Sequence, residues 1–367
     1  MLGVGGADRR AEDHQQLRGR ELIRFEGVHA RVAIFDLESA AAKERLQDPE
    51  VFEPDVTDSD RQSHFVLRCL RWLPVPVEAY PDGMRFAFMV DPQEGLTYSR
   101  MLALAQAAES AGFEAFVRSD HWLSLQGDWT AHATDAWTTL AGLARETSRI
   151  RLGTMVSPIT FRLPIGLAKA VATVDEMSGG RVDLGIGAGW YDPEHERFGI
   201  PYPPMGVRFE MLEEQLQILV GLWTQPRFTF AGRHYQLRDA ICEPKPVQRP
   251  HPPIVVGGYG KPKLLALAAR HADELNLDNP SPERAREIFA ELDEKCRAAG
   301  REPAAVRRSV MLAWDGPSAA AKPEDQRRLF EAYEAVGVDR MVLDGWPGPA
   351  TPDSIELLGR EVVAAFA

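Results

Sequence analysis

The sequence is poor in cysteine and in long apolar runs, and each shortage excludes a class of protein. Its three cysteines, Cys69, Cys242 and Cys296, are far apart and form no C-x-x-C pair. That spacing argues against a disulfide framework or a cysteine zinc site. No apolar run approaches the roughly 18 residues that span a bilayer, and the N-terminus has no apolar signal segment. We therefore expect a cytoplasmic protein with no membrane partner.

The chain also lacks an excess of positive charge. It has 54 acidic residues against 42 Lys and Arg, which gives a formal net charge of −12. General nucleic-acid binders present basic surfaces, so we expect no nucleic-acid partner. A small anionic ligand needs only local positive charge and stays compatible with this balance. With 44% hydrophobic residues in 367, the chain can form a full core, and a small-molecule substrate is the expected partner.

Residues 1–83 differ in pattern from the rest of the chain. They open with the polar, aperiodic stretch MLGVGGADRRAEDHQQLRGR and contain only short apolar pieces. The turn signal PDG follows, and Met84 begins a clean strand pattern, MRFAFMV. We keep two interpretations, a poorly ordered N-terminal extension and an upstream start-site artefact with translation beginning at Met84.

Residues 84–367 repeat one pattern eight times, a short apolar strand followed by an amphipathic helix. Such alternation predicts parallel strands covered by helices. Eight units predict a (β/α)8 TIM barrel in preference to a doubly wound sheet. Residues 225–253 interrupt the pattern with RFTFAGRHYQL, a predicted hairpin, and with the proline-rich PKPVQRPHPP. We interpret this segment as an excursion from the barrel.

The exits of the strands are informative, because active sites of TIM barrels lie at the C-terminal ends of the strands. The second strand exits into Asp120 and His121, a carboxylate beside an imidazole. A histidine in this position can take or give a proton near neutral pH, so we predict that His121 is catalytic. The structural alternative is that Asp120 caps a turn and His121 packs beside it.

Two other exits are rich in glycine. Gly185-Ile186-Gly187-Ala188-Gly189-Trp190 has G-x-G-x-G spacing, which is not the G-x-G-x-x-G of a dinucleotide-binding fold. We expect these glycines to let a flat ligand approach the backbone. Gly257-Gly258-Tyr259-Gly260 leads into a helix beside Lys261, where free amides suit a phosphate. A plain turn is the alternative at both exits. The histidines form no H-E-x-x-H pattern or close pair, so no metal site is predicted.

Three stretches together resemble the luciferase-like flavin-dependent oxidoreductases: SDHW, RIRLGTMVSPITFRLP and TVDEMSGGRVDLGIGAGWYDPEHERFGIP. A fourth, PKPVQRPHPPIVVGG, is most similar to the branch that uses the deazaflavin coenzyme F420. The resemblance covers essentially all of residues 84–367 and none of 1–83. It implies a luciferase-like barrel and an oxidoreductase that uses F420 for hydride transfer to or from a small organic substrate.

The resemblance also implies roles for single residues. The isoalloxazine-like ring would lie over the ends of the second to fourth strands, with a non-proline cis peptide behind it at Met155–Val156. His121 would transfer a proton, and Asp120 would contact the polar edge of the ring. The predicted cofactor-binding residues are Asp120, Met155, Val156, Gly187, Trp190, Gly257, Gly258, Tyr259 and Gly260.

One position departs from the family pattern. Some dehydrogenases of the family carry a glutamate where this chain has Trp190. The departure argues against sugar-phosphate or small-alcohol dehydrogenation by their scheme and leaves His121 to act alone or with a substrate group. Trp190 favours instead stacking or a bulky apolar substrate.

Two alternative functions stay open. One is an FMNH2-dependent monooxygenase of the alkanesulfonate monooxygenase type, with FMN in place of F420. The other is a non-catalytic flavin or deazaflavin carrier. The resemblance further implies a homodimer and a flavin or F420 reductase as the electron source. Specificity is expected in the loops 123–132 and 225–253, neither of which identifies the substrate.

Overall fold

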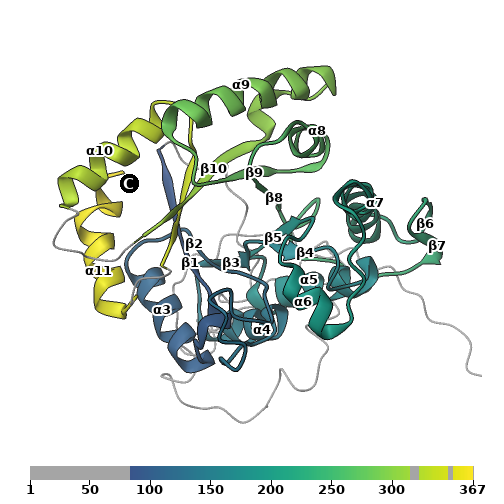
Figure 1. The fold of residues 1–367 in the computed structure, drawn as a ribbon, viewed down its shortest axis with the longest axis horizontal. Coiled ribbons are helices and arrows are strands. Elements are labelled where there is room, and N and C mark those ends of the chain that lie inside the picture. The colour runs from purple at the N-terminus through teal and green to yellow at the C-terminus, as the bar shows by residue number, and fades with distance from the viewer. Residues whose placement is uncertain (1–82, 315–321, 346–349, 367) are drawn as a thin grey trace, which may run out of the picture. The chain divides into compact units, whose positions relative to one another are not determined.

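Eight parallel strands form a closed barrel (Figure 1) in the computed structural model, which describes residues 83–314, 322–345 and 350–366. They are β1 (Arg85–Val90), β2 (Ala115–Arg118), β3 (Arg151–Thr154), β5 (Val182–Gly187), β8 (Ile254–Gly258), β9 (Glu274–Asp278), β10 (Arg307–Ala313) and β11 (Arg340–Asp344). Pairing of β3 with β5 closes the ring, and the short β4 (Ser157–Pro158) adds to β5. The predicted (β/α)8 barrel is confirmed. Residues 1–82 lie outside the described residues, so the structure tests neither interpretation of residues 1–83.

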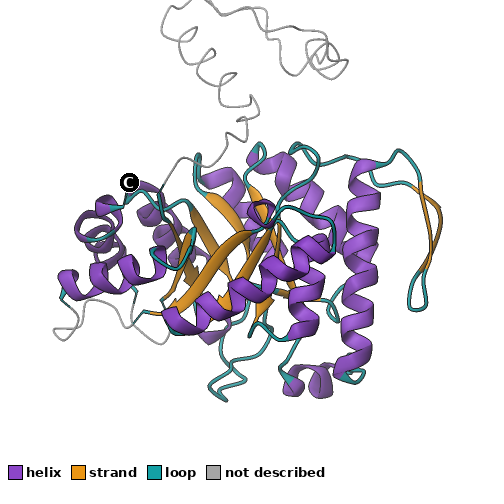
Figure 2. Ribbon diagram, turned by 90° about the horizontal axis from the view of Figure 1, so that it is seen from above, coloured by secondary structure: helices purple, strands orange, loops and turns teal. Residues whose placement is uncertain are grey.

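Helices surround the barrel (Figure 2). They are α3 (Tyr98–Ser110), α4 (Ala136–Glu146), α5 (Pro164–Ser178), α7 (Met205–Thr224), α8 (Pro262–His271), α9 (Pro282–Ala298), α10 (Pro323–Glu334) and α11 (Pro352–Glu361), with the short α6 (Asp192–Phe198), η1 (Pro92–Glu94), η2 (Pro303–Ala305) and η3 (Val363–Ala365). Side chains of Asp135 and Ser281 cap α4 and α9 by accepting a first-turn backbone N–H. Within the described ranges, no helix combines the length and apolar character needed to cross a bilayer.

The predicted excursion contains the predicted hairpin. Strands β6 (Phe228–Ala231) and β7 (Gln236–Ala240) pair antiparallel, separate from the barrel sheet. The chain then returns to β8 through a connector in which the bonds before Pro244 and Pro250 are cis. A proline-rich connector of this kind adopts extended conformations, which suits a link from a hairpin back to the barrel.

The strands alternate between two apolar layers. In β1, Phe86 and Phe88 belong to the large core between the strands and the helices. Ala87 and Met89 belong to a smaller cluster that includes Met155 and residues of several other strands. This period of two is that of a strand buried on both faces. The inner layer therefore consists of alanine, valine and methionine side chains.

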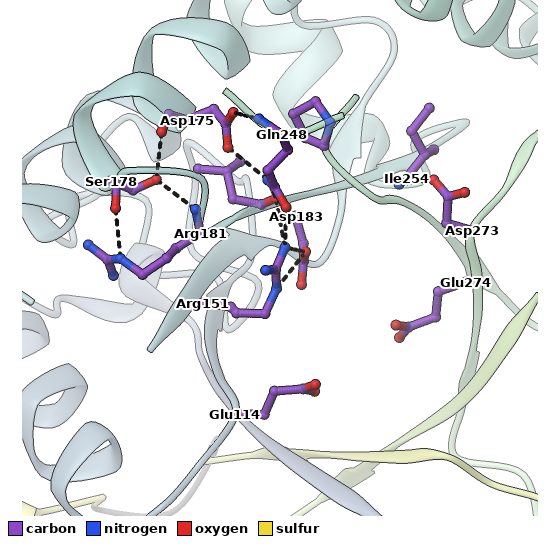
Figure 3. Close-up of polar contacts among 12 residues, drawn as sticks. Glu114, Arg151, Asp175, Ser178, Arg181, Asp183, Gln248, Ile254, Asp273 and Glu274 are labelled. Atoms are coloured by element: carbon purple, nitrogen blue, oxygen red, sulfur yellow. Dashed lines mark hydrogen bonds and ion pairs between the residues drawn. The ribbon is translucent and has the colours of Figure 1, made fainter. Parts of the chain in front are cut away.

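Charged side chains close the N-terminal end of the barrel. Arg340, the first residue of β11, contacts Asp183 at 3.2 Å and Glu274 at 2.6 Å. Asp183 belongs to β5, on the opposite side of the strand order, so this contact crosses the barrel interior. Figure 3 shows Arg151 beside Asp183, with Glu114, which directly precedes β2, and Glu274, the first residue of β9, around them. Burial alone would raise the pKa of Asp183, but Arg151 and Arg340 outweigh it and hold that pKa below its usual range. Because these charged side chains fill the N-terminal end of the barrel, the C-terminal end is the one expected to bind a ligand.

Candidate functional site

The predicted site residues follow four strands that are consecutive neighbours in the barrel. The pairing order is β2, β3, β5 and β8. Because all of these strands are parallel, their C-terminal ends meet along one side of the same rim. The structure therefore brings together the exits that contain His121, Val156, Trp190 and Tyr259, which are spread over more than a third of the sequence.

A bulge follows β3. The Met155–Val156 peptide bond is cis, as the resemblance implies, and the backbone N–H of Met155 donates to the carbonyl of Arg118 at 2.8 Å. The side chain of Val156 extends toward β5 and β8. A Cβ added at Gly187 would lie 2.8 Å from Val156 Cγ2, and one added at Gly257 would lie 2.9 Å from Val156 Cγ1. The glycines therefore accommodate Val156. The expectation that Gly185, Gly187 and Gly189 let a flat ligand approach the backbone stays a prediction. Their contact with a cofactor stays a prediction.

Glu194, on α6, is the residue that the sequence interpretation missed. Its carboxylate Oε2 lies 2.9 Å from Nδ1 of His121. Its Oε1 accepts the backbone N–H of Trp122 at 2.5 Å and that of Leu123 at 3.1 Å. The expectation that His121 lacks a carboxylate partner is therefore wrong. Position 190 holds no glutamate, but Glu194, four residues later, places a carboxylate beside His121. The acidic residues of WYDPEHERFG, directly after a strand exit, were the available sequence signal for such a partner.

The carboxylate of Asp120 binds other side chains of the protein. Its side chain is fully buried, and Oδ2 accepts from Ser157 Oγ at 2.6 Å and from Arg162 Nη1 at 2.5 Å. Arg162 also contacts the carboxylate of Asp135, the N-cap of α4, at 2.5 Å. Burial opposes the charge of Arg162, but the two carboxylates outweigh it and raise the pKa of the guanidinium. Asp120 thus ties the β2 exit to the starts of β4 and α4, and its predicted contact with a cofactor ring stays a prediction.

An aromatic surface lies beside His121. The ring of Trp190 meets that of His121 edge-on at 5.6 Å, and the ring of Tyr191 does so at 5.9 Å. Trp129 joins them, since its indole N–H donates to the Tyr191 hydroxyl at 3.4 Å. Trp190 is 60% exposed and Trp129 43% exposed. We call Trp129, Trp190 and Tyr191 the aromatic wall.

The β8 exit has the backbone that the sequence predicts for a glycine-rich turn. Gly258 and Gly260 have positive φ angles of 153° and 66°. The turn leads into α8, for which Lys261 is the N-cap, and the first turn of a helix leaves backbone N–H groups available. Tyr259 is exposed, and partial burial together with the Asp278 carboxylate raises the pKa of its phenol. The arrangement suits an anion, and the predicted phosphate contact stays a prediction.

The side chains that could bind a metal ion or act as thiol nucleophiles are those of His, Cys, Asp and Glu. Among the residues that the structure covers, no group of three such side chains is arranged to hold a metal ion. Cys242 and Cys296 are buried and free, and burial raises the pKa of each thiol. Raised pKa values leave these thiols protonated and unreactive. Cys69 lies outside the described residues.

Comparison with known proteins identifies related sequences. A family model described as luciferase-like monooxygenase matches residues 84–357. An uncharacterized protein of Mycobacterium tuberculosis (strain ATCC 25618 / H37Rv) is 36% identical over 200 residues, or 48% of this chain and 70% of that one. The FMNH(2)-dependent dimethylsulfone monooxygenase of Pseudomonas putida is 32% identical over 178 residues, 48% of this chain and 47% of that enzyme. The F420-dependent glucose-6-phosphate dehydrogenase of Microbacterium testaceum (strain StLB037) is 32% identical over 224 residues, 59% of this chain and 64% of that enzyme.

Solved structures agree on the fold. An F420-dependent secondary alcohol dehydrogenase in complex with an F420-acetone adduct matches 78% of this chain and 100% of its own, with a TM-score of 0.68 and 20% sequence identity. At that identity the likeness concerns the barrel alone. Of the two named enzymes above, one is FMNH2-dependent and the other F420-dependent.

Proposed function

Because the chain belongs to the luciferase-like monooxygenase family, we propose that it is an F420-dependent oxidoreductase that transfers a hydride to or from a small organic substrate. The observation that carries the proposal is the meeting of two features on one side of the rim. His121, bound to the buried Glu194, follows β2, and the Val156 bulge follows the adjacent β3. The F420-dependent relative supports the choice of cofactor.

The residues present fit a deazaflavin that carries a phosphate. Val156 and its glycine neighbours give an apolar surface at the rim that suits a flat ring. The positive-φ turn from Gly257 to Gly260, the start of α8 and the exposed Lys261 suit a phosphate group. When bound, F420 supplies the hydride-transfer chemistry. We propose that Met155–Val156 and Gly187 lie against the ring and that Gly257 to Gly260 hold the phosphate.

His121 is the proton-transfer residue in this proposal. Glu194 binds its Nδ1, and the rings of Trp190 and Tyr191 meet it edge-on, so the imidazole is held in one orientation. A well-placed acid or base of this kind contributes roughly 10²–10⁴-fold to a rate. The protein thereby orients the reactants and handles the proton that accompanies hydride transfer.

The aromatic wall indicates the substrate class. We propose an apolar organic alcohol, aldehyde or ketone that packs on Trp190 beside His121. An exposed aromatic surface next to a titratable group is typical of a ligand-binding surface. Trp190, which stands where some family dehydrogenases carry a glutamate, adds exposed apolar surface at this position, and this favours an apolar substrate over a sugar phosphate.

An FMNH2-dependent monooxygenase is the second candidate, because the dimethylsulfone monooxygenase is also a relative. In that case a separate flavin reductase would supply the reduced flavin, and the aromatic wall would exclude water from the rim. A homodimer is proposed in either case. A non-catalytic carrier would need no proton-transfer residue, and the buried carboxylate bound to His121 weighs against it.

The test is to titrate the purified full-length chain with F420 and, separately, with FMN. The proposal expects tight binding of F420 and weak binding of FMN. A panel of apolar alcohols, aldehydes and ketones, added with oxidised or reduced F420, then identifies a substrate from the change in F420 absorbance. Tight FMN binding without F420 binding, and turnover that requires O2, would establish the monooxygenase instead.

A further inference from the structure

We propose that Glu194 is a positioning residue that holds His121 in one tautomer, with Nδ1–H toward the carboxylate and Nε2 free for proton transfer. The inference rests on the proposed function, since it assigns the role of His121 to one of its two nitrogens. The two residues are 73 apart in sequence, and α6 brings the carboxylate to the exit of β2.

One buried carboxylate contacts three nitrogen atoms. The backbone N–H groups of Trp122 and Leu123 share Oε1, and Nδ1 of His121 lies beside Oε2. The side chain of Glu194 is 1% exposed and that of His121 12% exposed. A buried carboxylate needs hydrogen-bond partners to offset its loss of hydration, and these three nitrogen atoms are placed to supply them.

The chemistry of the donors settles the direction of the third bond. Backbone N–H groups can only donate, so Oε1 acts as an acceptor. An ionised carboxylate accepts at both oxygens, which leaves Nδ1 of His121 to carry the hydrogen. Within the described part of the chain, Nε2 of His121 has no hydrogen-bond partner. In the neutral ring, Nε2 is therefore the nitrogen with the available lone pair.

The surroundings restrict the ring further. Trp190 and Tyr191 meet the imidazole at interplanar angles of 79° and 87°, so rotation of the ring would displace both. Glu194 from α6 contacts the imidazole, and the carboxylate of Asp120, the preceding residue, is paired with Arg162. When Nε2 takes a proton, the negative charge of Glu194 stabilises the imidazolium.

Replacement Glu194→Gln tests the proposal because it preserves size. The amide oxygen can still accept the two backbone N–H groups, which turns the amide NH2 toward Nδ1. A donor at that position makes Nδ1 an acceptor and moves the hydrogen to Nε2. Heteronuclear NMR of labelled histidine side chains reports the tautomer in the full-length chain at a pH where the ring is neutral. The resonances of His121 are assigned by their loss in His121→Gln.

We expect the Nδ1–H tautomer in the wild type and the Nε2–H tautomer in Glu194→Gln. Glu196→Gln, an exposed change on the same helix, is the matched control and should leave the spectrum of His121 unchanged. An Nε2–H wild type, or a folded Glu194→Gln with the wild-type tautomer, overturns the proposal. If Glu194→Gln does not fold, the wild-type spectrum decides alone. Titration of the same samples with F420 separates the two proposals, because absent F420 binding with the expected tautomers rejects the cofactor and leaves the role of Glu194 standing.

Discussion

The side chain of Val156 fills the space that a side chain at Gly187 would need, with Val156 Cγ2 only 2.8 Å from the position of the added Cβ. The two residues belong to the exits of neighbouring strands, so the shape of the rim depends on this fit. The glycine is thus explained by packing within the protein.

Gly187→Ala should therefore destabilise the chain by about 1–3 kcal/mol, the usual result of overpacking. Denaturant unfolding measures the change. Val156→Ala in the same chain should restore part of the loss, because it removes the atoms that clash. Gly206→Ala, where an added Cβ meets nothing within 4 Å, is the control. A Gly187→Ala variant as stable as this control would contradict the observed position of Val156.

Asp183→Asn should lower the free energy of unfolding at neutral pH by about 3 kcal/mol, since it leaves Arg340 with one fewer buried partner. The pKa of Asp183 is lowered in the fold, so its stabilisation is present above the unfolded value of about 4 and is lost as the pH falls below it. The difference between wild type and variant should shrink in acid. The exposed Glu334→Gln is the control, and a pH-independent difference would count against the ion pair.

His121→Ala should reduce turnover roughly 10²–10⁴-fold while the dissociation constant of F420 changes little. Steady-state rates with the substrate identified in the panel, together with F420 titration, separate the two effects. Glu334→Gln, an exposed change on α10 outside the site, should behave as wild type. Unchanged turnover in His121→Ala would remove this residue from the mechanism.

Trp190→Ala should raise the KM for apolar substrates roughly 10- to 100-fold, because the variant loses the binding free energy of the apolar contact with the indole. Trp190→Phe should retain most of the affinity, because a ring remains in the wall. The affinity for F420 should change less than the KM. A weaker F420 affinity with an unchanged KM would instead assign Trp190 to the cofactor.

The barrel could be predicted from sequence because its signal is local and repeated. Each strand–helix unit has its own apolar pattern, and eight units admit few arrangements. The site depends on contacts between distant segments, which local patterns do not contain. Glu194 reaches His121 across 73 positions, and Arg162 reaches Asp120 across 42. The exits of the strands were therefore correctly expected at one rim, while the partners of their polar side chains were not.

Glycine shows the same limit at a smaller scale. The sequence indicates that Gly187 and Gly257 need space above the backbone, and it does not say what fills that space. The structure fills it with Val156, whose direction depends on the bulge after β3. Residues that fit a ligand and residues that fit a neighbouring side chain have the same appearance in the sequence.

The central claim is the identity of the cofactor, and the most direct measurement is the mass of the small molecule retained by the protein purified from the organism that makes it. The account predicts F420. Retention of FMN, with no F420 detected and no binding when F420 is added, would contradict it.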